Sequence, residues 1–345
     1  MKLRVLVSCV AALGVILAGC TTGGPATTGG VTVQEPAPGQ KITLKAVHSV
    51  NERTTYHTNF VKFKQAVEAR TNGGITIEVF PNESLVKARD TLDAMSKGVA
   101  DLGFISFAYY PGDLPFNSDA QILPFSVTWD TAPKVLAAGK PIFQKEVDKF
   151  NMNLLYPQPA VGHFMLKRPF PDAGNPNFGG QRINGVGPLA KVVELLGGSA
   201  TSIPGSELPT AIRTGVIDGM WSSIQTYVNT DMVGDAPNLY DLGSGTMSMG
   251  IWWAINKDTW NRLPESWQKI LLEEAAKAGN SYIDEVQATD RAEAERALAK
   301  GGKITKLTPD QLKVWRQKLQ PYYEAIIQKH GEPMKAWLDT VDKIK

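Results

Sequence analysis

The sequence repeats one nine-residue pattern, and this repeat limits the folds open to the chain. DAMSKGVAD (93–101) and TAIRTGVID (210–218) share an alanine, an apolar residue, two polar residues, Gly-Val and a final aspartate. In each copy a helical pattern ends at glycine, which readily adopts the left-handed conformation of a helix C-terminus, and a short strand pattern follows. The repeat predicts two related lobes. The alternative is that Asp101 and Asp218 only organise the turns.

Strand and helix patterns alternate along the first part of the chain. Residues 42–47 (ITLKAV) and 75–81 (ITIEVFP) alternate apolar and polar side chains as strands do, and the segment between them has apolar residues at helical spacing. Residues 102–106 (LGFIS) form a third short strand pattern. This order is typical of α/β layers, so we expect an α/β fold.

A long segment from 263 to 301 contains few helix breakers. A continuous helix of about 37 residues would extend roughly 55 Å, enough to brace two lobes. A break at Gly279-Asn280 would instead give two shorter helices. The sequence leaves both possibilities open.

The N-terminus has the pattern of an export signal. Lys2 and Arg4 precede an apolar run that ends in LAGC (17–20), which matches the bacterial lipobox. We therefore expect residues 1–19 to be a signal peptide and Cys20 to carry lipid. Residues 20–40 are rich in Thr, Gly and Pro and are expected to form a tether. The alternative is an ordinary signal peptide with a chance cysteine.

Composition excludes several function classes. The chain has 345 residues, 43% hydrophobic and 20% charged, which fits two globular domains. A net charge of +2 without a basic run argues against a nucleic-acid partner. The only cysteines are Cys9 and Cys20, so the folded part has no disulfide, thiolate metal site or cysteine nucleophile. The four histidines lack metal-ligand spacing, and we expect no metal, no cofactor and no catalytic residue.

One motif resembles a dinucleotide-binding loop. GVGPLA (185–190) fits Gly-x-Gly-x-x-Ala, and Glu207 follows about twenty residues later. However, the preceding NFGGQRIN is not a buried apolar strand, and Pro188 removes a backbone N–H. Export also places the chain where nicotinamide cofactors are scarce. We therefore interpret the match as a coincidence.

The same segment predicts an anion site. Arg182 is the only charged residue between Asp172 and Lys191, and a helix pattern begins at Pro188 just after it. A helix N-terminus offers unpaired N–H groups, and a guanidinium can hold a carboxylate through two parallel hydrogen bonds. The alternative is that Arg182 pairs with Asp218 or another acid within the chain.

These segments together resemble the solute-binding subunits of tripartite ATP-independent periplasmic (TRAP) transporters, the DctP-like family. The similarity covers about residues 42–330, and its order and spacing are specific. The resembling segments are FKQAVEARTNGGITIEVFPNESL, LDAMSKGVADLGFIS, LPF (123–125), GGQRINGVGPLAKVVELLGGSATSIPGSELPTAIRTGVIDG and INKDTWNRLPESWQKIL.

The resemblance implies a two-lobed periplasmic-binding-protein fold with hinge strands and a long lobe-spanning helix, closing on its ligand. Lobe I would comprise 41–160 plus 248–287, and lobe II 161–247 plus 288–345. Arg182 matches the arginine that holds the ligand carboxylate. The other implied ligand-binding residues are Ser49, Ser106 and Tyr109 in lobe I, and Val186, Trp221 and Ser222 in lobe II. Asn184 and Gln225 are added by proximity, and His163, or alternatively Arg168, stands near the place of a second family arginine.

The implied function is capture of a small organic acid anion and its delivery to the small and large integral membrane subunits of a transporter. We expect a monomer in the bacterial periplasm that touches the membrane only through its lipid anchor. Two alternatives remain: a ligand-sensing module of a receptor system, and an exported dehydrogenase. The dehydrogenase lacks an identifiable acid, base or metal cluster.

Overall fold

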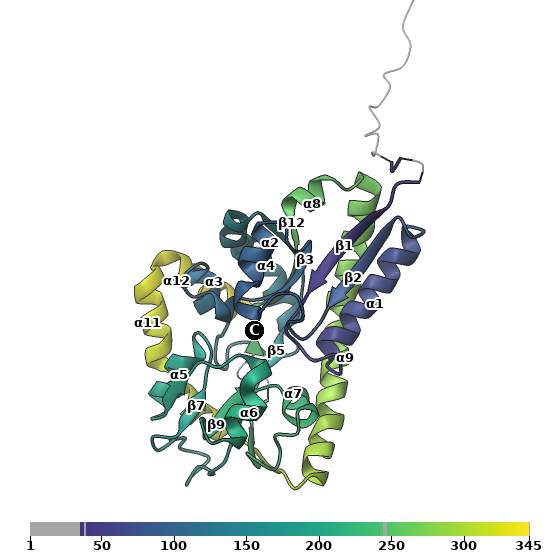
Figure 1. The fold of residues 1–345 in the computed structure, drawn as a ribbon. Helices are drawn as coiled ribbons and strands as arrows, with labels where there is room; N and C mark the ends of the chain where they lie inside the picture. Colours follow the sequence, from purple (N-terminus) through teal and green to yellow (C-terminus); the bar gives the residue numbers. More distant parts are fainter. Residues whose placement is uncertain (1–34, 38, 244–246, 345) are drawn as a thin grey trace, which may run out of the picture. The chain divides into compact units, whose positions relative to one another are not determined.

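The computed structural model describes residues 35–37, 39–243 and 247–344. The predicted signal peptide and Cys20 lie outside these residues. The described chain forms two mixed sheets with helices around them (Figure 1), as the alternating sequence patterns predicted. We call the part built on the first sheet lobe I and the part built on the second sheet lobe II.

Lobe I is built on a five-stranded sheet of order β2-β1-β3-β12-β4. β1 is parallel to β2 and β3, whereas β12 is antiparallel to β3 and β4. The strands are β1 (Ile42–Val47), β2 (Ile75–Phe80), β3 (Leu102–Ser106), β4 (Met152–Pro157) and β12 (Ile251–Asn256). The helices are α1 (Thr55–Arg70), α2 (Thr91–Ser96), α3 (Pro115–Ala120), α4 (Ala132–Val147) and α8 (Lys257–Asn261).

Lobe II is built on a six-stranded sheet of order β13-β10-β6-β9-β7-β8. β7 is parallel to β8 and β9, and β6 is antiparallel to β9 and β10. The strands are β6 (His163–Leu166), β7 (Arg182–Asn184), β8 (Ser199–Thr201), β9 (Gly219–Ser222), β10 (Asn238–Asp241) and β13 (Lys303–Lys306). The helices are α5 (Leu189–Leu195), α6 (Leu208–Arg213) and α7 (Ile224–Asn229).

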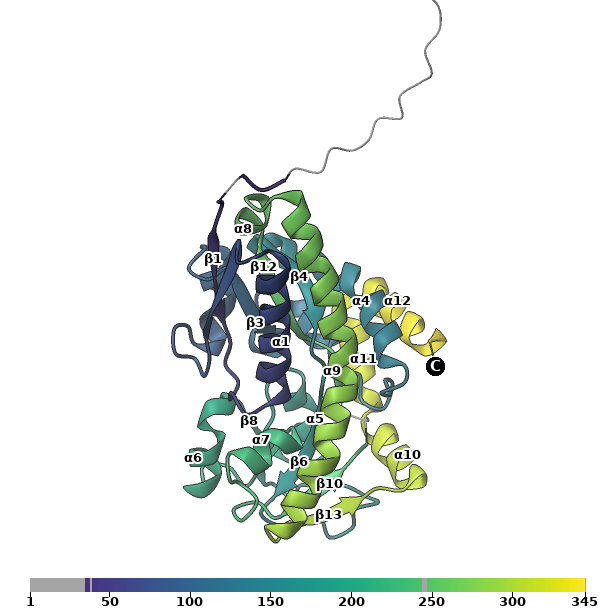
Figure 2. The ribbon, with the colours of Figure 1, turned by 90° about the vertical axis from the view of Figure 1, so that its right-hand side faces the viewer.

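Within the described residues, a short ribbon and a long helix join the lobes, in addition to the C-terminal helices described below. β5 (Ala160–Val161) and β11 (Met247–Ser248) form a short antiparallel ribbon where the chain passes between the sheets. α9 (Glu265–Ala299) is one helix of 35 residues that continues through Gly279 and packs on α1 and β4 in lobe I and on α7 and β13 in lobe II (Figure 2). The continuous form of the 263–301 segment is therefore correct. Among the described helices, none has the length together with the apolar character needed to cross a membrane.

The sequence repeat corresponds to a structural repeat. α2 is followed by Gly98 at φ +72° and then by β3, while α6 is followed by Gly215 at φ +75° and then by β9. The two copies belong to different sheets, which confirms the prediction of two related lobes. In each copy the terminal aspartate accepts a hydrogen bond from a backbone N–H of the neighbouring strand: Lys45 N to Asp101 Oδ2 at 2.9 Å, and Arg182 N to Asp218 Oδ2 at 3.0 Å.

The C-terminal helices differ from the lobe assignment expected for residues 288–345. α10 (Pro309–Lys318) lies beside lobe II, where Trp315 Nε1 donates to Ala173 O at 2.9 Å. α11 (Gln320–His330) contacts both α5 and α3, and α12 (Glu332–Lys343) packs on α3 and α4 of lobe I. The buried indole of Trp337 anchors α12 by donating to Ala120 O at 3.2 Å. The last helix therefore belongs to lobe I, because its apolar face covers α4.

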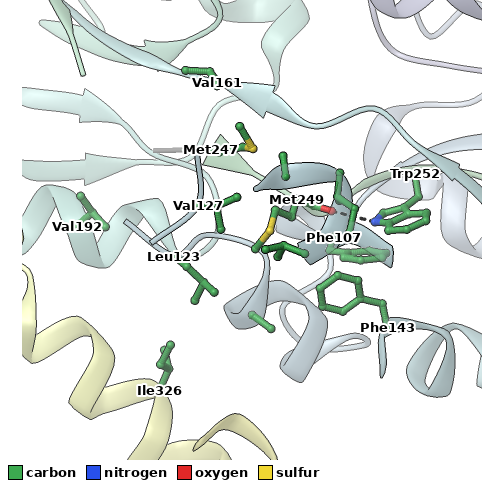
Figure 3. Close-up of a cluster of buried hydrophobic side chains, with 14 of the residues drawn as sticks. Phe107, Leu123, Val127, Phe143, Val161, Val192, Met247, Met249, Trp252 and Ile326 are labelled. Carbon is green, nitrogen blue, oxygen red and sulfur yellow. Dashed lines mark hydrogen bonds between the residues drawn. The ribbon is translucent and has the colours of Figure 1, made fainter. Parts of the chain in front are cut away.

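A continuous apolar core extends through the connection between the lobes (Figure 3). Phe107 and Trp252 from lobe I, Val192 from α5 and Ile326 from α11 belong to this one cluster. Met249 lies beside the ribbon, and its carbonyl accepts the indole N–H of Trp252 at 2.9 Å. The core fixes the ends of the strands that carry the site.

Candidate functional site

A cavity of about 320 Å³ lies between the lobes. It is formed where β1 and β3 of lobe I and β7 and β9 of lobe II end, since Ser49, Ser106, Asn184 and Ser222 at or just after these ends line it. The carboxyl ends of parallel strands meet at one edge of a sheet, and ligands of α/β proteins bind at such edges. The topology therefore brings together residues that are far apart in sequence.

The lobe I wall combines hydroxyl groups with aromatic rings. The hydroxyls of Ser49 and Ser106 are not hydrogen-bonded within the described part of the chain. Tyr109 and Phe104 supply aromatic surface. Burial raises the pKa of the Tyr109 phenol, which therefore stays protonated and uncharged at neutral pH.

The lobe II wall is set by the end of β7. Asn184 is buried, and its Oδ1 accepts the N–H of Ile203 at 2.7 Å. Because that partner is a donor, the amide orientation is fixed, and Nδ2 is the donor that this lining residue retains. Val186, Trp221 and Ser222 complete this wall, with the Trp221 ring packed against Gly162, where a Cβ would lie 1.8 Å from the indole.

Three contacts between the lobes close the cavity. Arg89 Nη2 in lobe I donates to Ser202 Oγ in lobe II at 2.9 Å. Ser206 Oγ donates to Glu83 Oε2 at 3.2 Å. Gly187, at φ +59°, lies so close to lobe I that a Cβ there would be 2.8 Å from Ala108 O.

Comparison with known families identifies this two-lobed arrangement. The family described as "Bacterial extracellular solute-binding protein, family 7" (DctP) matches residues 46–153 and 181–330. These ranges contain both halves of the cavity wall. The chain belongs to this family.

Relatives of this family 7 solute-binding protein share most of its length. The C4-dicarboxylate-binding periplasmic protein DctP of Rhodobacter capsulatus is 24% identical over 317 residues, 89% of this chain and 92% of that protein. A Bordetella pertussis extracytoplasmic solute receptor solved with pyroglutamic acid has a TM-score of 0.79 at 21% identity, covering 87% of this chain and 99% of its own. A TRAP solute-binding protein of Sulfurospirillum deleyianum with bound succinate has a TM-score of 0.78 at 23% identity. The match covers 89% of this chain and 100% of that one. The chain thus has the TRAP solute-binding fold.

Most of the predicted site residues meet at the cavity of this solute-binding protein, but Arg182 does not. Its Nε lies 2.9 Å from Asp218 Oδ2 and its Nη2 lies 3.0 Å from Asp218 Oδ1, an in-chain bidentate pair. The hydrogen bond from Arg182 lowers the pKa of Asp218. Of the two possibilities that the sequence left open, the structure shows the pair with Asp218: Arg182 lies at the start of β7, whereas the cavity is at the end of that strand. The residues of the prediction that do line the cavity are Ser49, Ser106, Tyr109, Asn184, Val186, Trp221 and Ser222.

The predicted anion site at Pro188 also differs from the structure. α5 has only seven residues, and the N–H groups of Ala190 and Lys191 already donate to the carbonyls of Gly187 and Pro188 at 3.0 and 3.1 Å. A short parallel strand, β7, precedes the glycine loop with Ile183 buried, so the expectation of no buried strand there is wrong as well. The glycine loop nevertheless packs on Ala108, so it serves the contact between lobes.

Gln225 and His163 lie outside this cavity. Gln225 Oε1 accepts from the backbone N and the Oγ1 of Thr55 in lobe I, at 3.0 and 2.9 Å, and its Nε2 donates to Asp290 Oδ1 at 3.1 Å. His163 is buried beside a second cavity of about 240 Å³, with Nδ1 3.5 Å from Asp241 Oδ1. Burial lowers the pKa of His163, so its ring is neutral at pH 7. Gln225 was expected at the ligand from proximity in sequence, and His163 from the family resemblance.

Several cavity residues were not predicted from the sequence. They come from helices, strands and loops that approach one another only in the folded chain, and no local motif marks them. These residues are Asn51, Tyr56, Asn82, Ser206, Ser223, Thr226 and Ser248. Within the described ranges, no three His, Cys, Asp or Glu side chains converge as a metal site requires.

Proposed function

We propose that this chain captures a small organic solute in the cavity between its lobes and delivers it to the membrane subunits of a TRAP transporter. The observation that carries the proposal is the cavity of about 320 Å³, with hydrogen-bonding groups from the strand ends of both lobes. This volume is in the range of small-molecule sites. Closure of the lobes removes the solute from water and distinguishes the loaded protein from the empty one.

Organic acids are the reference ligands for the proposal. The Rhodobacter capsulatus relative is named for C4-dicarboxylates, and the two solved relatives hold pyroglutamic acid and succinate. In this chain the binding groups are the serine hydroxyls, the Asn184 amide and the aromatic rings, without Arg182. The chain is proposed to bind its solute without chemical conversion.

We propose that the protein works in the periplasm at the membrane surface. The lipobox sequence LAGC (17–20) supports export and acylation of Cys20, and the Thr/Gly/Pro-rich residues 20–40 supply a tether. The protein would work as a monomer beside the membrane. Mass spectrometry of the mature N-terminal peptide tests the acyl group.

Solute capture is tested by calorimetry and small-angle scattering on the purified chain. A panel of organic acids and their neutral analogues should contain ligands that bind at one site per chain and reduce the radius of gyration. Uptake of a labelled ligand by cells with and without the membrane subunits separates transport from sensing. A ligand that binds, but whose uptake is unaffected by loss of those subunits, contradicts the transport role.

A further inference from the structure

The wall of the cavity carries no charged side chain. Among the described residues, those that line it are hydroxyl, amide, aromatic and aliphatic, with no Asp, Glu, Lys, Arg or His. Recognition here must therefore use hydrogen bonds between neutral groups and apolar contact.

The charges just behind the wall do not favour an anion. Glu83, with its side chain 8% exposed, accepts a hydrogen bond from Ser206, a wall residue. Its carboxylate thus lies one side chain away from the ligand space. Lys87 is 3.8 Å from Glu83, but its side chain is 72% exposed and largely screened by water.

The guanidinium of Arg89 contacts a wall residue, but Arg89 does not line the cavity. The Arg89 guanidinium carbon lies 5.5 Å from the centre of the Tyr109 ring, and Nη2 is bonded to Ser202 at 2.9 Å. His48 precedes the wall residue Ser49, but burial lowers the pKa of His48 to about 4, so the ring is uncharged at neutral pH. Neither group offers a positive charge to the cavity.

Helix termini do not replace the missing cation. Of the described helices that begin beside the cavity, α1 has 16 residues, whereas α5 has seven and α6 and α7 have six each. At the start of α1 the N–H of Thr55 is bonded to Gln225 Oε1 at 3.0 Å. A carboxylate entering this cavity would lose its hydration without gaining an ionic partner, which is unfavourable.

The free polar groups suit an uncharged ligand. Lobe I offers the hydroxyls of Ser49 and Ser106, and lobe II offers the hydroxyl of Ser222 and the Nδ2 of Asn184. A hydroxyl can both donate and accept, so this set matches ligand hydroxyl, carbonyl or amide groups without requiring charge. Trp221 and Tyr109 provide surface for a carbon ring or chain.

We propose that the cavity selects a small organic molecule with no net charge at neutral pH, bearing hydroxyl or amide groups on a carbon skeleton. The proposal rests on the proposed solute-binding function and narrows its ligand class. It separates this chain from relatives that were solved with organic acids.

Matched acids and primary amides test the proposal, because each pair has nearly the same size and shape. The probes are succinate and succinamide, malonate and malonamide, pyroglutamate and its amide, and galacturonate and galacturonamide. Calorimetry with the full mature chain at pH 7.5 should give at least tenfold tighter binding for the neutral member of a pair that binds. The Kd of the neutral ligand should change less than twofold between 20 and 300 mM NaCl, since salt screens only charged interactions.

A second measurement uses the ligand that the protein itself carries. Ligand released by denaturing the purified chain should pass through an anion exchanger at pH 7. If an acid binds at least as tightly as its neutral partner, or the released ligand is retained by the exchanger, the inference is wrong and solute capture stands. If neither series binds and nothing is released, solute capture itself is contradicted and the inference fails with it.

Discussion

Arg182 and Asp218 form a bidentate ion pair and a pair of main-chain contacts, and the main-chain contacts recur in the other lobe. Asp218 N donates to Arg182 O at 2.7 Å and its Oδ2 accepts from Arg182 N at 3.0 Å, just as Asp101 N donates to Lys45 O and its Oδ2 accepts from Lys45 N, both at 2.9 Å. Arg182 therefore occupies the position in lobe II that Lys45 occupies in lobe I. The pair joins β7 to the turn before β9, outside the cavity.

Replacing Arg182 with alanine should leave ligand affinity within about twofold. The side chain is 48% exposed and lies outside the cavity, so it adds modestly to stability. Since pairing lowers the pKa of Asp218, its stabilising contribution is present above the unfolded-state value of about 3.9 and is lost as pH falls through the lower folded-state value. The melting temperatures of wild type and Arg182→Ala should therefore differ at pH 7 and converge in acid. A large loss of affinity in this variant would restore the ligand role of Arg182.

Neighbouring serines should separate binding from stability. Both serines line the cavity, but the Ser222 hydroxyl has no hydrogen-bond partner among the described residues, whereas Ser223 Oγ accepts the Thr226 N–H at 3.2 Å and caps α7. Ser222→Ala should weaken ligand binding about three- to tenfold, the effect of one neutral hydrogen bond, with little change in unfolding. Ser223→Ala should cost about 0.5–2 kcal/mol of unfolding free energy, as loss of a helix cap does. Calorimetry and urea unfolding on both variants check this, and equal effects on affinity would contradict the assignment.

Asp290→Asn should stabilise the protein at neutral pH. Burial, followed by repulsion from Glu293 and Asp241, raises the pKa of Asp290 to about 6 despite the hydrogen bond from Gln225. The folded state then binds more protons than the unfolded state between about pH 4 and 6, so this group lowers stability as pH rises through that window. Asparagine keeps an acceptor for Gln225 and carries no charge.

The gain in unfolding free energy from Asp290→Asn should reach at most about 3 kcal/mol at pH 7.5, since one pKa unit corresponds to about 1.4 kcal/mol. The gain should vanish below pH 4. Urea unfolding at both pH values measures it. A gain that is the same at pH 4 and pH 7.5 would show that charge is not its cause.

Gly187→Ala should hinder closure of the lobes. A methyl group at this position would lie 2.8 Å from Ala108 O in the opposite lobe, so the closed state would be strained. Affinity should fall at least tenfold, and the radius of gyration with ligand should stay near that of the unliganded protein. Gly180→Ala is the matched control, because Gly180 also has positive φ, +73°, but a methyl group there would have no atom within 4 Å. Equal losses in both variants would assign the effect to backbone strain.

Local sequence patterns predicted the helices and strands well, because the formation of a helix or strand depends on residues that are close in the sequence. The apolar spacing of Phe60, Phe63 and Val67 places one face of α1 in the core, and Gly98 and Gly215 end the repeated helices at positive φ. The resemblance also placed Ser49, Ser106 and Ser222 at the cavity. These residues end strands, and the ends of parallel strands share one edge of a sheet.

Expectations from the sequence were wrong where the partner of a residue is distant. The sequence left open whether Arg182 holds a ligand or pairs with Asp218, which lies 36 positions away, and the fold brings the two together across β7 and β9. Gln225 was placed at the ligand, but it joins Thr55 to Asp290 across 170 and 65 positions. No local motif indicates contacts between residues so far apart in the sequence.

The sequence alone determined the α/β alternation, the two related lobes, the long apolar-faced helix and the family. Periodicity and turn glycines decide these features through interactions within a few residues. Only the tertiary structure decided which polar groups line the cavity. Strand direction puts Arg182 at one end of β7 with its acid and Asn184 at the other end in the cavity, two residues or about 7 Å apart. The ion pair of Arg182 and Asp218 therefore lies about 7 Å along the strand from the cavity, whose described lining residues carry no charge.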